Sequence, residues 1–134
     1  MRLSDRAAVR IGYALSSVVI LFMLFDGGVK LVPLAMVIEG TAQLGYPATV
    51  SFVRGLGILG LSCTVLYAIP RTSVLGAILL TGYLGGTVAT HLRVGSPIFS
   101  HMLFGVYLGI LLWGGLYLRD GRLRSLIPYR RYAA

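Results

Sequence analysis

Charged side chains are scarce in this chain, and their scarcity excludes an ordinary soluble protein. Only 12% of the 134 residues are Asp, Glu, Lys or Arg, and 57% are apolar. A typical soluble domain carries about 25% charged residues. The apolar residues form long blocks without the polar face that a helix on a soluble protein shows to water. The sequence therefore predicts an integral membrane protein.

Cysteine is nearly absent, and acidic residues are few. Cys63 is the single cysteine, which excludes an internal disulfide, a C-x-x-C site and the C-x-x-C-H motif of covalent haem attachment. It lies within an apolar block, which favours a buried structural thiol. Four acidic residues against 12 basic ones give a net charge of +8. Because the basic residues gather in the tails and not along a groove-sized face, we expect no nucleic-acid binding.

Long apolar blocks divide the chain into four predicted spans. A helix needs about 20 residues to cross a membrane, and segments at about 11–32, 49–69, 72–92 and 98–118 are long enough. Prolines stand at or near the proposed boundaries, where the missing N–H costs least: Pro33, Pro47, Pro70 and Pro97. The predicted fold class is all-α, an integral membrane four-helix bundle forming a single domain over residues 1–134.

The first apolar run is expected to stay in the mature protein. It follows three arginines, as a signal-peptide core does, but it is longer than such a core and no small-residue cleavage pattern follows it. Basic residues in the flanks predict the orientation. They occur before the first span, between the second and third, and after the fourth: Arg2, Arg6, Arg10, Arg71, Arg119, Arg122, Arg124, Arg130 and Arg131. We therefore expect both termini to be cytoplasmic.

The segment from Leu34 to Pro47 is too short to span. It carries Glu39 and Gln43 one helical turn apart among apolar residues. An interfacial helix and a re-entrant turn both fit this pattern.

Glycines are abundant within the spans. The run from Gly55 to Gly60 matches G-x-G-x-x-G by letter, but the dinucleotide fingerprint needs a preceding strand, so close helix packing is the better interpretation. The pairs Gly82/Gly86 and Gly105/Gly109 have the GxxxG spacing of tight contacts between membrane helices. The pattern predicts a compact bundle and is compatible with a homo-oligomer.

Ionisable residues fall at similar depth in all four spans, near the outer surface. Asp26 and Lys30 lie one turn apart on the first span, where they can pair, and His91 and His101 flank the turn between the third and fourth. Ionisable groups inside a membrane are expensive and are functional candidates. The predicted site comprises His91, His101, Asp26, Lys30 and Arg54 as reactive groups, with Glu39, Gln43, Tyr83 and Thr87 as ligand-contacting groups.

Other interpretations of the same residues stay open. Asp26 with a nearby cation can be a structural ion pair, and Lys30 or Arg54 can extend to lipid headgroups. The histidines can simply be interfacial, and Tyr83 and Thr87 can simply fill the core. Two histidines and a carboxylate give at most a weak three-ligand metal site, so none is assigned. Axial haem ligation by histidine is less favoured than a quinone.

Several short motifs together resemble the DoxX-like family of small four-helix bacterial membrane proteins, from about Ile11 to Leu118. They are Phe25-Asp26-Gly27-Gly28-Val29-Lys30-Leu31, Leu44-Gly45-Tyr46-Pro47, Arg54-Gly55-Leu56-Gly57, Ala89-Thr90-His91-Leu92-Arg93 and Phe99-Ser100-His101. The resemblance implies a multi-pass protein of the bacterial inner membrane. It also implies a membrane subunit of a thiosulfate:quinone oxidoreductase or a partner in thiol and oxidative-stress systems; wider relatives resemble assembly chaperones and cargo receptors.

Two classes of function follow. In the first, the bundle binds a quinone-like molecule: a histidine bonds a carbonyl oxygen and shuttles its proton, Arg54 and Lys30 stabilise negative charge, and Asp26 and Glu39 orient the cations. Because the chain encodes no electron donor, this hypothesis requires a membrane or periplasmic redox partner. In the second, the protein is a non-catalytic membrane partner or chaperone-like subunit. Solute or proton transport is weaker, because the cytoplasmic half has no matching ionisable residues.

Overall fold

The computed structural model describes residues 3–32 and 34–129, and within them it contains helices and no strand. The elements in chain order are α1 (Leu3–Leu31), α2 (Ala35–Gln43), α3 (Val50–Ala68), α4 (Ser73–Arg93), η1 (Ile98–Met102), α5 (Phe104–Arg119) and α6 (Gly121–Arg124). Four helical segments, α1, α3, α4 and the combined η1–α5, are long and apolar enough to cross a membrane. The predicted all-α membrane bundle of four helices is confirmed.

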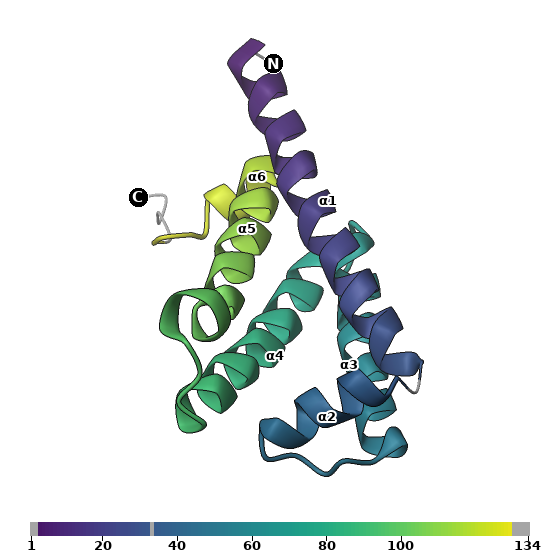
Figure 1. Ribbon diagram of the computed structural model, residues 1–134. Coiled ribbons are helices and arrows are strands. Elements are labelled where there is room, and N and C mark those ends of the chain that lie inside the picture. The colour runs from purple at the N-terminus through teal and green to yellow at the C-terminus, as the bar shows by residue number, and fades with distance from the viewer. Residues whose placement is uncertain (1–2, 33, 130–134) are drawn as a thin grey trace.

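The four long helices form a ring. Helix α1 packs against α3 and α5, and α4 packs against the same two helices, so α1 and α4 lie across a diagonal. The start of α1 and helix α6 lie at one end of the bundle, which we call the α6 end. Helix α2 and the turn from α4 to η1 lie at the other, the α2 end (Figure 1). Helices α1 and α5 are adjacent near α6 and diverge toward the α2 end (Figure 1).

The basic flanks gather at the α6 end. Arg71 of the α3–α4 turn shares a surface cleft there with Arg122 of α6, and Arg6 and Arg10 lie on the first turns of α1. Four residues used in the predictions of boundaries and orientation lie outside the described residues: Arg2, Pro33, Arg130 and Arg131.

The helix bounds differ from the predicted spans mainly at two places. Helix α1 has 29 residues and begins well before residue 11. Its length of about 43 Å exceeds the roughly 30 Å hydrocarbon core, so its charged first turns lie beyond the apolar run that hydropathy detects. The fourth span is divided, because the amides of His101 and Met102 both bond the Pro97 carbonyl and form the wider turn η1. The short segment before α3 is the helix α2, followed by a loop.

Small residues bring the helices together at the α6 end. A Cβ on Gly76 of α4 would lie 2.2 Å from the backbone nitrogen of Tyr67 on α3, and one on Gly115 of α5 would lie 2.6 Å from Ser16 Oγ on α1. The Tyr67 side chain is fully buried. Its hydroxyl donates to the Leu112 carbonyl at 2.8 Å and pairs with Ser16 Oγ at 2.9 Å. One tyrosine thereby ties α1, α3 and α5 into the core.

The glycine patterns have mixed outcomes. Gly57, in the G-x-G-x-x-G run, lies on a helix, and a Cβ there would meet the Gly27 carbonyl at 2.9 Å, so this run serves helix packing. Gly105 also sits in close contact, 2.9 Å from Val88 for an added Cβ. The expected contact fails for Gly82, Gly86 and Gly109 among the described residues, since a Cβ on any of the three would meet no atom there within 4 Å. Equal spacing therefore serves two different purposes in this fold.

Candidate functional site

The diverging helices leave a cleft of about 660 Å³ at the α2 end, which we call the polar cleft. Its walls come from α1, α2, α4, η1 and α5. Residues predicted for the site that line it are Asp26, Lys30, Gln43, Tyr83, Thr87, His91 and His101. The remaining wall includes the apolar side chains of Phe22, Met23, Leu84, Phe104 and Leu108. The fold thus combines polar groups from separate helices with an apolar surface.

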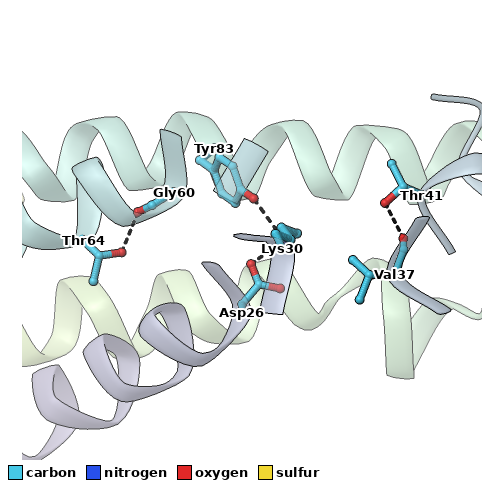
Figure 2. A network of polar contacts seen from close by, with 7 residues as sticks. All are labelled: Asp26, Lys30, Val37, Thr41, Gly60, Thr64 and Tyr83. Carbon is cyan, nitrogen blue, oxygen red and sulfur yellow. Dashed lines mark hydrogen bonds and ion pairs between the residues drawn. The ribbon is translucent and has the colours of Figure 1, made fainter. Parts of the chain in front are cut away.

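Lys30 joins the two diagonal helices. From α1, its ammonium donates a hydrogen bond to the Asp26 carboxylate one turn earlier and another, 3.2 Å long, to the Tyr83 hydroxyl on α4. Figure 2 shows Lys30 between these two partners. An ammonium has three N–H donors, and the third has no partner among the described residues. The side chains of Lys30 and Asp26 are 19% and 30% exposed, so the pair remains accessible from the cleft.

The two imidazoles face each other across the mouth of the cleft. His91 lies in the last turn of α4 and His101 lies on η1; their ring centroids are 5.9 Å apart in an edge-on arrangement. A serine hydroxyl engages the Nδ1 atom of each ring, from Ser96 at 2.9 Å for His91 and from Ser100 at 2.7 Å for His101. The serines orient the rings, and no hydrogen bond to Nε2 of either ring comes from the residues that the structure describes. His91 is half-buried and His101 is exposed, so the pair connects the cleft with the surface.

Two predicted residues do not line the polar cleft. Glu39 is exposed on α2. Arg54 is exposed near the start of α3, where its Nε donates a 3.1 Å hydrogen bond to the Leu31 carbonyl at the end of α1. An arginine in this position satisfies a terminal carbonyl and complements the negative end of the helix dipole. The structure thus gives Arg54 a capping contact between two helices.

The loop from α2 to α3 is fastened to α4 by residues that the site prediction omitted. The Tyr46 hydroxyl pairs with Thr90 Oγ1 at 2.7 Å, and an Arg93 N–H donates to the Leu44 carbonyl at 2.8 Å. Gly45 between them has a φ of 81°, which favours glycine. A Cβ at Gly45 would also lie 2.8 Å from the Arg93 guanidinium. The Gly-Tyr-Pro turn was the signal in the sequence. No rule of residue spacing identifies the residues on α4 that bind this turn.

The site contains no evident metal centre. No group of three His, Cys, Asp or Glu side chains within residues 3–32 and 34–129 is arranged to hold a metal ion. Cys63 is buried in α3. The side chains in the cleft can form hydrogen bonds, exchange protons at imidazole and stabilise negative charge through Lys30.

Comparison with known proteins agrees with this architecture. The family model for DoxX-like proteins matches residues 14–115, which include every residue that lines the polar cleft. The chain belongs to the DoxX-like family. No curated protein and no solved structure matches it significantly. The resemblance predicted from the short motifs is confirmed, and the four apolar helices make this DoxX-like protein a multi-pass membrane protein in contact with the lipid bilayer.

Proposed function

We propose that the polar cleft binds the head of a quinone-like lipophilic molecule and that this DoxX-like protein is the quinone-binding subunit of an oxidoreductase system. The proposal rests on one observation: the Lys30–Tyr83 bridge and two oriented imidazoles line the same cleft of about 660 Å³ within a membrane bundle. A quinone head needs donors for its two carbonyl oxygens and an apolar surface for its ring. Lys30 and the imidazole Nε2 atoms provide the donors, and Met23 and Leu84 provide apolar wall.

The same groups suit the reduction of a quinone to a quinol. That reaction adds two electrons and two protons to each quinone. An imidazole can accept a proton on one ring nitrogen and release one from the other, so His91 and His101 can pass protons from the exposed mouth of the cleft to the two oxygens. The ammonium of Lys30 stabilises negative charge that develops on an oxygen. The electrons come from a redox partner protein, in the membrane or the periplasm, since the one cysteine of the chain is buried and has no second thiol with which to cycle.

Binding of a short-tailed benzoquinone to the purified protein tests the proposal. We expect Lys30→Met, and the double change His91→Ala with His101→Ala, each to weaken binding at least tenfold, or by about 1.4 kcal/mol. Arg54→Met is the matched control, because it removes a cation at similar depth that does not line the polar cleft. Unchanged affinity in the double histidine variant would refute the mechanism. Mass spectrometry of an organic extract supplies an independent measurement, with near-stoichiometric quinone expected.

A second candidate function is that of a non-catalytic partner or chaperone-like subunit. A groove of about 390 Å³ runs between α4 and α5, where Gly85 and Gly109 leave open space beside Trp113. A helix of another membrane protein, or of a second copy, fits such a small-residue surface. Purification of a stoichiometric protein partner without any bound quinone would favour this function. A Gly109→Trp variant is expected to release that partner.

We also propose that the α6 end is cytoplasmic and that the polar cleft faces the periplasm, in the bacterial inner membrane. The concentration of arginines at the α6 end supports this orientation. Single cysteine replacements of Gln43 and Arg122 test it in intact cells with a membrane-impermeant maleimide. Labelling is expected at position 43 alone, and the buried Cys63 contributes little background. Labelling at position 122 alone would reverse the orientation.

A further inference from the structure

A second cleft, of about 270 Å³, lies between α3 and α4; we call it the apolar slot. Leu56 and Leu59 of α3 form one side, and Gly82 and Gly86 of α4 form the other. Lys30, Tyr83, Thr87 and His91 line both this slot and the polar cleft. The two spaces are therefore neighbours that share one wall of side chains, and one molecule can lie across both.

Glycine is the reason that the slot exists. At the α6 end, Gly76 lets α4 approach α3 so closely that an added Cβ would be 2.2 Å from the Tyr67 backbone. Farther along the same helix, Gly82 and Gly86 are exposed, and no atom of residues 3–32 or 34–129 lies within 4 Å of an added Cβ at either. Helices α3 and α4 are farther apart at this level, and because glycine has no side chain, the space between them stays open. Because these residues lie within a membrane span, their exposed side faces lipid.

Two polar groups at the rim of the slot, the hydroxyls of Tyr46 and Thr90, are already satisfied. Tyr46 and Thr90 pair their hydroxyls at 2.7 Å, and Thr90 also donates to the Gly86 carbonyl at 2.8 Å. Leu59 is 52% exposed and extends the apolar wall outward. A polar group that already has a hydrogen-bond partner in the protein loses little free energy when an apolar molecule covers it. A polar group without such a partner loses its hydrogen bonds to water. The slot therefore offers an apolar surface that opens sideways to the hydrocarbon and touches the polar cleft at Tyr83.

We propose that the apolar slot is the lateral entrance and the seat for the isoprenoid or alkyl tail of the ligand. This inference rests on the proposed function, which places the quinone head in the polar cleft beside Lys30 and the histidines. The tail stays in the slot between α3 and α4, in continuity with the acyl chains, while the head reaches the donors near the membrane surface.

A quinone with a decyl tail that ends in a photoreactive diazirine tests the slot in nanodiscs. We expect it to label peptides that contain Leu56 and Leu59 in the native chain, and Gly86→Leu to reduce that labelling at least tenfold. Gly85→Leu is the matched control, because Gly85 has equally open space but lines the groove between α4 and α5. A tail-less benzoquinone is expected to bind all three proteins equally. Gly82→Leu replaces Gly86→Leu if the latter does not fold, as judged by circular dichroism.

The outcomes separate the slot from the proposed function. Equal labelling of the native chain and Gly86→Leu, or labelling lost equally in Gly85→Leu, overturns the slot. Slot-specific labelling without any binding of the tail-less quinone supports an apolar-tail seat and overturns the quinone head site. Binding of the tail-less quinone that depends on Lys30, with no labelling in the slot, leaves the proposed function intact and overturns the inference.

Discussion

The two ends of the bundle use tyrosine for different purposes. At the α6 end, Tyr67 is fully buried and its hydroxyl is bonded to Ser16 and the Leu112 carbonyl. At the α2 end, Tyr83 is half-buried, and its hydroxyl accepts from Lys30 at the wall of two clefts. One tyrosine completes a core, and the other helps to form a binding surface. The difference arises from helix separation, which the glycines of α4 set along its length.

The largest expected effect compares two glycines on α4. In Gly76→Ala the new Cβ meets backbone atoms of Tyr67, which cannot rotate away, so α3 and α4 must separate. We expect a loss of about 3 kcal/mol in the free energy of unfolding, the upper end of typical overpacking costs. Gly86→Ala enters open space and gains up to about 1 kcal/mol from helix propensity. Chemical unfolding in mixed micelles, followed by circular dichroism, measures both, and similar curves would refute the account of helix separation.

The two tyrosines provide the second test. Tyr67→Phe leaves the buried Ser16 hydroxyl without its partner, and we expect a cost of about 1–3 kcal/mol in stability. Tyr83→Phe keeps the ring near the Lys30 ammonium, 5.7 Å from the centroid, and loses one half-exposed hydrogen bond, so its cost is expected below about 1 kcal/mol. A thiol-reactive dye that reports exposure of the buried Cys63 on heating compares the variants. A reversed order would mean that the packed end is not the more stable one.

Much of this architecture was predictable because a bilayer imposes simple constraints. A membrane fixes how long an apolar block must be, so hydropathy located the four spans. The depth of a residue follows from its distance along a span, and similar depth grouped Lys30, His91 and His101 in the prediction, with Tyr83 deeper on the same span as His91. These residues line the polar cleft because the helices that carry them pack around it.

Rotation about each helix axis was not predictable in the same way. Arg54 has the right depth, yet it faces the end of α1 and not the cleft. The pairs Gly82/Gly86 and Gly105/Gly109 have the same spacing, yet Gly105 is in close contact and Gly86 lines a slot. Which face meets a neighbour depends on how all four helices pack together. That information is not contained in any one segment.

The loop between α2 and α3 gives a smaller and more local effect. Tyr46→Phe removes the 2.7 Å hydrogen bond to Thr90 at the half-buried base of the loop, for a cost of about 1 kcal/mol. Because this loop covers the α2 end, we expect faster amide hydrogen exchange over residues 44–49 and nearly unchanged exchange in α5. Tyr107→Phe is the control, since Tyr107 is exposed on α5. If exchange in the loop does not change, the loop is held at the bundle by the Arg93 contact instead.

The smallest effect is expected for Arg54, and it decides whether this residue belongs to the site. Its bond to the Leu31 carbonyl is exposed, so Arg54→Ala is expected to cost about 0.5 kcal/mol, a value typical of an exposed charge at a helix end. Quinone affinity should stay within twofold of the native value, because the cleft is lined by Lys30 and not by Arg54. A tenfold loss of affinity without loss of stability would bring Arg54 into the ligand's surroundings. The reactive cation would then come from α3 as well as α1, and the binding region would include the start of α3, before the packed contact at Gly57.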